Sequence, residues 1–214
     1  SHPVAAPYFR GKAFVSGNPV RGGFFTRTSR AERRAHTHLV VAGGSQGAHA
    51  INLAMMAAAP QFTTLGARLA VTHQTGSQDC TEVRRVYAEL GLRARVEPFI
   101  EKMVELVRDA DVVVCRAGAT TLAELAAAGR PSVLVPLPGA ADGHQHANAD
   151  VFVRAGAAVL LPQSDLTGAT LAGSVLALVR DEERRDRMSV AAHALATPDA
   201  AEVIVDRVEQ MAGW

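Results

Sequence analysis

The sequence predicts an α/β fold, with a doubly wound parallel sheet of about six strands and helices on both faces. Short apolar runs alternate with helical patterns along most of the chain. Some runs, such as DVVVC at 111–115 after its first residue, are continuously apolar, as is usual for strands buried on both faces. Alternating strands and helices favour a parallel sheet, and right-handed crossovers then bring the carboxyl ends of all strands to one edge.

Six runs fit the strands of this sheet. Each is short and rich in aliphatic residues, and most are bounded by glycine, proline or polar residues. The expected strands span 38–44, 67–74, 94–99, 111–115, 132–138 and 157–162.

Helical patterns fill most of the chain between and after these runs. The helix at 120–129 has a clear end, because Gly129 can cap it and Pro131 cannot continue it. Residues 1–37 fit no strand–helix unit. The expected helices span 47–59, 79–91, 101–110, 120–129, 143–155, 167–180, 182–196 and 199–212.

Composition bounds the possible functions. The 214 residues, 48% of them hydrophobic, support one well-cored domain with or without appendages. The net charge of +1 gives no general case for nucleic-acid binding. Residues 1–38 nevertheless hold seven Lys or Arg against Glu32 alone, which suits either an anionic membrane surface or a solvated linker.

Cys80 and Cys115 show neither metal-ligand spacing nor a disulfide framework, so we expect a reduced, cytosolic setting. The sequence shows no signal peptide and no apolar run near the roughly 20 residues that span a bilayer. It starts with Ser-His-Pro rather than Met, which suggests a fragment or a processed chain.

The stretch GGSQGA at 43–48 follows the first expected strand. Its glycines permit a tight turn, Ser45 suits an N-cap, and Gly47 permits close approach of a ligand. Free amides at a helix N-terminus favour an anion. An ordinary strand–turn–helix corner explains the stretch equally well, since it matches neither G-x-G-x-x-G nor the P-loop.

The stretch CRAGATTLAEL at 115–125 repeats this arrangement after the fourth strand. Gly118 and the amides that follow it would face a ligand at the sheet edge. Thr121 and Glu124 also match a capping box, so Glu124 is either a capping residue or a ligand residue. Arg116 suits a phosphate or a nearby carboxylate.

The stretch DGHQHANA at 142–149 places polar side chains at the start of the expected fifth helix. Their mixture of donors and acceptors suits sugar hydroxyls, although a solvated helix start is an equal alternative. His144 and His146 do not share a helical face, so no metal site is expected there. The sequence shows no Ser-His-Asp grouping, no H-E-x-x-H and no C-x-x-C, and no convincing general base.

Together the motifs resemble the MurG family of bacterial UDP-N-acetylglucosamine transferases. The resemblance runs from about residue 14 to the C-terminus. The motifs that carry it are GNPVR (17–21), GGSQGA (43–48), HQTG (73–76), EPFIEKM (97–103), DVVVCRAGATTLAELAAAGRPSVLVP (111–136) and HQHANA (144–149). It implies the Rossmann-like, C-terminal half of a glycosyltransferase-B fold.

The resemblance also implies a division of the chain. Residues 1–29 would be a linker from the acceptor-domain side, and 30–197 would form the domain that binds the UDP-sugar donor. Residues 198–214 would form a helix that packs on an acceptor domain, which has no counterpart in this sequence.

For the nucleotide, the resemblance implies that Arg21 and Ser45, with neighbouring amides, hold the diphosphate. Phe99 and Ile100 would flank the uracil, and Met103 would pack nearby.

For the rest of the donor, Glu124 would accept hydrogen bonds from the ribose, and Thr121 would lie beside the phosphates. Gln145 and His144 would contact the N-acetylglucosamine hydroxyls. The full implied set is Arg21, Gly44, Ser45, Gln46, Phe99, Ile100, Met103, Ala119, Thr120, Thr121, Glu124, His144 and Gln145.

The implied reaction is inverting transfer of N-acetylglucosamine from UDP-N-acetylglucosamine to lipid I, which gives lipid II for peptidoglycan. Amides, helix N-termini and Arg21 would stabilise the departing UDP, so no metal or other cofactor is expected. The general base and the lipid I site would lie in the missing half, at the cytoplasmic face of the inner membrane, so this chain would bind donor without turnover. Two alternatives stay open: a glycolipid or natural-product glycosyltransferase with another UDP-sugar, and a non-catalytic donor-binding subunit.

Overall fold

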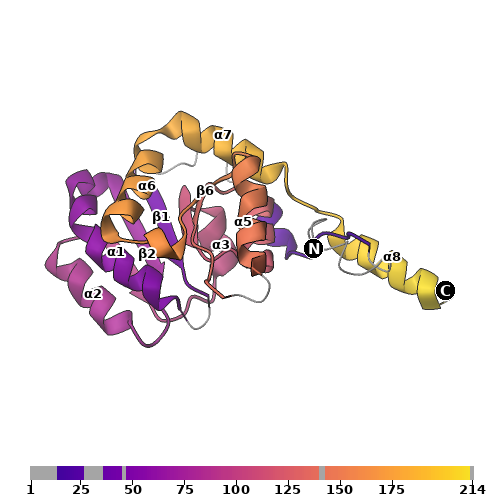
Figure 1. Ribbon diagram of the computed structural model, residues 1–214, viewed down its shortest axis with the longest axis horizontal. Coiled ribbons are helices and arrows are strands. Elements are labelled where there is room, and N and C mark those ends of the chain that lie inside the picture. The colour runs from indigo at the N-terminus through magenta and orange to yellow at the C-terminus, as the bar shows by residue number, and fades with distance from the viewer. Residues whose placement is uncertain (1–13, 27–35, 45–46, 140–142, 213–214) are drawn as a thin grey trace.

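One parallel sheet lies between two layers of helices in the computed structural model, which describes residues 14–26, 36–44, 47–139 and 143–212 (Figure 1). The strand order is β3-β2-β1-β4-β5-β6, the order of a doubly wound nucleotide-binding fold. The predicted fold class is therefore confirmed. The strands are β1 Thr37–Ala42, β2 Leu69–Gln74, β3 Ala94–Glu97, β4 Val112–Cys115, β5 Ser132–Leu134 and β6 Ala158–Leu160.

Each expected helix is present, with its ends shifted by up to three residues. Short 3-10 segments add to them at Gly22–Phe25 (η2), Thr63–Arg68 (η4) and Gln163–Asp165 (η6). The helices are α1 His49–Phe62, α2 Cys80–Glu89, α3 Met103–Arg108, α4 Ala119–Ala128, α5 His144–Arg154, α6 Gly168–Arg180, α7 Glu182–His193 and α8 Ala200–Ala212.

The sheet separates two apolar cores, and β1 shows why. Leu39 and Val41 face a cluster that includes residues of α1, α2 and α6, whereas Val40 faces a cluster with α3, α4 and α5. Successive side chains of a strand point to opposite faces, so a continuously apolar run is needed where both faces are covered.

The start of α1 differs from the prediction. The helix begins at His49 with Ala48 as its N-cap, so Ser45 is not the capping residue. Gly44 and Gly47 have φ of 81° and 78°, and this left-handed backbone extends the turn and delays the helix.

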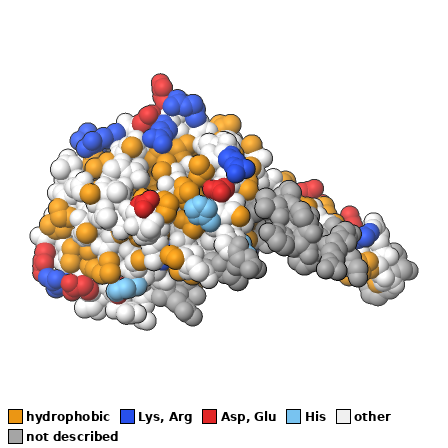
Figure 2. Space-filling view, in the orientation of Figure 1, with side chains coloured by type: hydrophobic (Ala, Val, Ile, Leu, Met, Phe, Trp, Pro, Cys, Tyr) orange, Lys and Arg blue, Asp and Glu red, His pale blue; other side chains and the backbone are white. Residues whose placement is uncertain are grey.

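The segment before β1 contributes to the fold. Phe24 in η2 is fully buried and joins the α3–α4 side of the core. At the other end of the chain, α8 projects away from the main body (Figures 1 and 2), and Ala200 is its one buried residue. Over the described ranges, none of the helices has the length and apolar character to cross a membrane.

Candidate functional site

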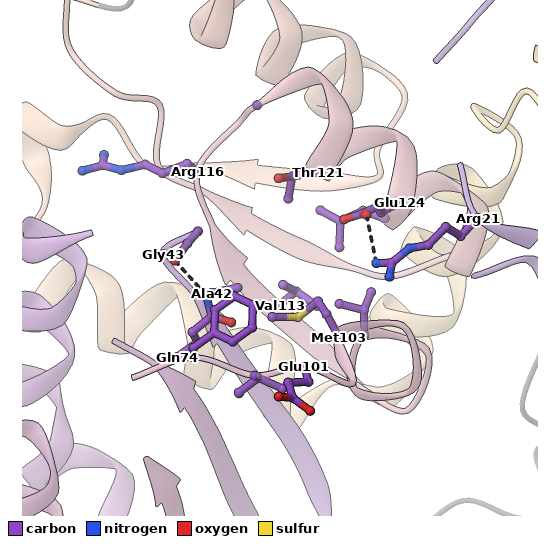
Figure 3. A pocket seen from close by; sticks show the side chains of 16 residues that line it. Arg21, Ala42, Gly43, Gln74, Glu101, Met103, Val113, Arg116, Thr121 and Glu124 are labelled. Atoms are coloured by element: carbon purple, nitrogen blue, oxygen red, sulfur yellow. Dashed lines mark hydrogen bonds and ion pairs between the residues drawn. The ribbon is translucent and has the colours of Figure 1, made fainter. Parts of the chain in front are cut away.

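A cavity of about 320 Å³ lies where the chain direction across the sheet reverses (Figure 3). From β1 the chain continues to β2 and β3 on one side, and then returns to β4, beside β1, before continuing to β5 and β6. The loops after β1 and β4 therefore separate at their carboxyl ends and leave a crevice, which is where doubly wound folds bind ligands.

Arg21 and Glu124 face each other across one side of this cavity. Arg21 Nη2 lies 3.7 Å from Glu124 Oε1. The Arg21 guanidinium also lies 5.4 Å from the ring centroid of Phe24, a favourable cation–π geometry. The buried Phe24 thus anchors Arg21 at the cavity, although 62% of the Arg21 side chain is exposed.

Burial shifts the pKa of two groups on this side of the cavity. It raises the pKa of Glu124, and the charge of Arg21 opposes the rise. Burial, helped by the charge of Glu124, raises the pKa of Cys115 to about 12. The thiol of Cys115 is therefore protonated at neutral pH and does not serve as a nucleophile.

The structure excludes the capping role for Glu124. Helix α4 begins at Ala119 with Gly118 as its N-cap, and no side chain caps it. Thr121 is then in the first turn and Glu124 lies beyond it, so the pair cannot form a capping box. Both side chains instead line the cavity.

The glycine turn after β1 forms a second wall. Gly43 and Gly44 line the cavity, and the Gly47 amide donates to the Gly44 carbonyl at 3.0 Å. Ser45 and Gln46, also predicted for the site, lie outside the described residues.

Arg116 lines the cavity, but its guanidinium is directed to β5. Its Nη1 donates to the carbonyls of Val135 at 3.2 Å and Pro136 at 3.3 Å. Of the described groups, the backbone carbonyls after β5 rather than a carboxylate therefore accept from this guanidinium.

An apolar wall completes the cavity. Phe99, Ile100 and Met103 come from the loop after β3 and the start of α3, and Ile100 is buried whereas Phe99 is 58% exposed. Behind them the floor is formed by Val107, Val113 and Leu125. The flat face of an aromatic ligand ring carries no hydrogen-bonding groups, so it can pack against these apolar side chains without losing hydrogen bonds.

Four predicted residues lie outside this cavity. Ala119 lines a different cavity, toward α5, and Thr120 is exposed. His144 is exposed at the start of α5, and Gln145 Oε1 accepts a hydrogen bond from the Leu137 amide at 3.0 Å. The latter two follow β5 at the same edge of the sheet.

Sequence reasoning missed two polar residues of the cavity, Gln74 and Glu101. Both belong to motifs that carry the resemblance, HQTG and EPFIEKM, and Gln74 is the last residue of β2. The position of Gln74 at the carboxyl end of an expected strand was the sequence signal that could have identified it. Among the described residues, no group of three or more His, Cys, Asp or Glu could hold a metal ion.

Residues 38–204 match the glycosyltransferase family 28 C-terminal domain. The chain belongs to glycosyltransferase family 28. Its match to the C-terminal domain of that family agrees with the strand order and with the cavity at the β1–β4 reversal.

Two curated relatives of this family 28 chain share the name UDP-N-acetylglucosamine--N-acetylmuramyl-(pentapeptide) pyrophosphoryl-undecaprenol N-acetylglucosamine transferase. The protein from Anaeromyxobacter sp. (strain Fw109-5) is 46% identical over 206 residues, which cover 95% of this chain and 54% of the relative. That from Geobacter sulfurreducens is 42% identical over 201 residues, 92% of this chain and 55% of the relative. The chain spans about half the length of the curated relatives it matches.

Comparison with solved structures supports the same family relationship. MurG of Acinetobacter baumannii superposes with a TM-score of 0.78 at 33% identity, over 87% of this chain and 55% of that one. The resemblance to MurG is thereby confirmed. An enzyme described as a UDP-N-acetylglucosamine 2-epimerase from Listeria monocytogenes has a TM-score of 0.68 at 15% identity, over 95% of this chain and 56% of that one, and shares the fold alone.

Proposed function

We propose that this chain is the donor-binding half of an inverting hexosyltransferase that transfers N-acetylglucosamine from UDP-N-acetylglucosamine to lipid I and yields lipid II. One observation carries the proposal. In a family 28 C-terminal domain, a cavity at the β1–β4 reversal brings together the Glu124 carboxylate, the Arg21 guanidinium and a glycine turn. These groups complement ribose hydroxyls and a diphosphate.

The nucleoside would occupy the side of the cavity that combines the apolar wall with Glu124. The uracil would lie against Ile100 and Phe99, with Met103 behind it. Glu124 would accept hydrogen bonds from the ribose hydroxyls, and these charged bonds compensate for the burial that raises its pKa.

The diphosphate would lie between the glycine turn and the N-terminus of α4, beside Thr121. Arg21, released from Glu124, and the backbone amides would neutralise the charge that builds on the β-phosphate as UDP leaves. Arginine and amides replace a divalent cation in this role, so we propose that donor binding needs no metal. His144 and Gln145 would contact the sugar hydroxyls beyond the phosphates.

The acceptor side would come from outside this chain. We propose that an acceptor domain supplies the lipid I site and the general base that deprotonates the attacking hydroxyl. Because lipid I is membrane-bound, the assembled enzyme would work as a peripheral protein at the cytoplasmic face of the inner membrane.

Calorimetric titration with UDP, UDP-N-acetylglucosamine, UDP-glucose and UDP-galactose tests the donor. We expect UDP-N-acetylglucosamine to bind most tightly of the three sugars. A preference for another UDP-sugar would support the glycolipid or natural-product alternative. If the chain does not bind UDP, the proposed function is wrong.

A further inference from the structure

The HQTG motif at 73–76 connects two walls of the cavity. The Gly43 amide donates to the Gln74 carbonyl at 3.4 Å, on the side of the glycine turn. The Thr75 and Gly76 amides donate to the carbonyls of Glu97 at 3.0 Å and Pro98 at 3.1 Å, just before the apolar wall. The motif therefore lies between the segment proposed to bind the diphosphate and the segment proposed to bind the base.

The side chain of Gln74 adds a specific contact to the glycine turn. Its Nε2 donates to the Gly44 carbonyl at 2.7 Å (Figure 3). The same carbonyl accepts from the Gly47 amide. Gln74 is 2% exposed, so this amide is shielded from solvent and its orientation is fixed. The bond thus sets the direction of the Gly44 peptide.

The other end of the Gln74 amide has no role in stability. Its Oε1 is buried without a hydrogen-bond partner in the part of the chain that the structure describes. A buried unsatisfied oxygen is destabilising, and an apolar side chain of similar shape would avoid this loss. Because Gln74 lines the cavity, this cost is consistent with a role in the site.

The end of the turn at Gly47 packs closely against the HQTG motif. A Cβ atom on Gly47 would lie 1.9 Å from the Thr75 carbonyl oxygen, which shows how closely the turn approaches HQTG. That carbonyl also accepts from Asn52 Nδ2 at 2.8 Å, which links it to α1. The turn is therefore fixed at Gly47 by packing and at Gly44 by Gln74.

We propose that Gln74 is a positioning residue for donor binding: its amide holds the Gly44 carbonyl and so orients Gly43 and Gly44 at the wall of the cavity where the diphosphate is proposed to bind. The inference rests on the proposed function. Gln74 is not expected to touch the nucleoside, and its loss should weaken binding only of ligands that carry phosphates.

The variant Gln74→Met tests this, because it keeps the length of the side chain and removes the Nε2 donor. Gln163→Met is the matched control: Gln163 also has a buried, unpartnered Oε1, but it lies in η6 and does not line the cavity. Affinities for UDP and for uridine are measured by calorimetry or NMR titration, with thermal unfolding of each variant.

We expect Gln74→Met to weaken UDP binding about three- to ten-fold, the effect of one hydrogen bond, with uridine affinity unchanged within about two-fold. Gln163→Met should leave both affinities unchanged. Unchanged UDP affinity in Gln74→Met would overturn the inference, and so would an equal loss for uridine, which would indicate a direct nucleoside contact.

Gln74→Asn provides a second variant should the methionine protein not fold. It keeps the amide, but its shorter side chain does not reach the Gly44 carbonyl, so the same selective loss of UDP affinity is expected. UDP binding by the wild-type chain distinguishes failure of this inference from failure of the proposed function. If this chain binds UDP and both variants bind equally well, only this inference fails, whereas no UDP binding by the wild type would overturn the proposed function with it.

Discussion

Glu124 is partly buried, which raises its pKa, and the charge of the neighbouring Arg21 opposes the rise. A carboxyl whose folded-state pKa is raised destabilises the fold when it ionises, so the loss is absent below its unfolded pKa and appears as the pH rises through the folded value. Keeping an ionised glutamate here at neutral pH therefore opposes stability, which is consistent with a binding role.

The variant Glu124→Gln should separate binding from stability. It removes the charged acceptor, and charged hydrogen bonds contribute roughly 1.5–3 kcal/mol, so UDP affinity should fall about ten-fold or more. Thermal stability at neutral pH should be equal or higher, because the ionised group is lost and its exposed partner contributes little. Glu105→Gln, at an exposed site on α3, is the control. Lower stability with unchanged UDP affinity in calorimetry would contradict the ribose role.

Which residues line the cavity was predictable from the sequence only where a motif carries them. Arg21, Ile100 and Glu124 were found through the resemblance, and the structure brings all three to one cavity. Gln74 was missed because its role depends on which carbonyl its amide meets, and that carbonyl is 30 residues away in the chain. Composition and periodicity do not report such contacts.

At the scale of elements, the two glycines of the turn should respond differently to substitution. Gly47→Ala would place its Cβ 1.9 Å from the Thr75 oxygen, whereas a Cβ on Gly44 would have no neighbour within 4 Å among the described residues. Both have positive φ, which costs an L-residue about 1–2 kcal/mol. Gly44→Ala should lose about that much unfolding free energy in urea denaturation, and Gly47→Ala clearly more. Equal losses would show that the turn can move away from HQTG.

A buried network ties the elements behind the turn together. His73 Nδ1 lies 2.9 Å from the Tyr87 hydroxyl and His73 Nε2 lies 3.0 Å from Asn52 Oδ1. Asn52 Nδ2 donates to Thr75 and, at 2.7 Å, to Asp79, so its Oδ1 must accept from His73. In the neutral ring, Nε2 donates to Asn52 and Nδ1 accepts from the Tyr87 hydroxyl, and burial favours this form because it lowers the pKa of His73 to about 3, although Asp79 opposes the shift.

The network predicts a specific pH dependence of stability. A histidine with a lowered pKa binds a proton in the unfolded chain first, so its contribution to stability is lost as pH falls from about 6.5 toward about 3. The slope approaches about 1.4 kcal/mol per pH unit well below pH 6.5. His73→Gln retains a donor and an acceptor but cannot titrate, so the difference in unfolding free energy between the two proteins should change with pH below 6.5, and its slope should approach this value as the pH falls toward 5. A constant difference would indicate that His73 is accessible to protons when folded.

Strand identity was predictable and strand length was not. The apolar run 132–138 suggested a long strand, but β5 ends at Leu134. The next carbonyls, of Val135 and Pro136, are bound by the Arg116 guanidinium instead of a neighbouring strand. An apolar pattern shows that a segment is buried, but it does not show which donor satisfies its backbone.

For the whole molecule, the charge balance of the site predicts metal-independent binding. The cavity offers Arg21 and backbone amides to a diphosphate, whereas Mg²⁺ sites rely on carboxylate oxygens and the phosphates themselves. Its described lining holds two carboxylates, Glu101 and Glu124, and because Glu124 is proposed to bind the ribose, only Glu101 would be left for a cation. UDP affinities measured by calorimetry with chelator and with added Mg²⁺ should agree within about two-fold. A loss beyond about ten-fold in chelator would mean that a cation bridges the diphosphate.

Helix α8 presents an apolar face that the rest of the described chain does not cover. Val205, Val208 and Met211 are 53%, 60% and 78% exposed. Apolar groups concentrated on one exposed element indicate an interface or an aggregation liability. We propose that an acceptor domain covers this face in the assembled enzyme, which is consistent with a chain that spans about half the length of its relatives.

This arrangement predicts that binding and transfer respond separately to changes on α8. The isolated chain should bind UDP-N-acetylglucosamine without transfer to lipid I, and α8 should exchange its amide hydrogens faster than α1 to α7, because so little of it is buried. An acceptor half from a curated relative, added in trans or fused, should protect α8 and restore transfer. Val208→Asp should abolish both effects and leave UDP affinity unchanged, whereas Val190→Asp, at a 65% exposed site on α7, should change neither. Efficient transfer by the isolated chain would overturn this argument, since it would require a general base and an acceptor site within these 214 residues.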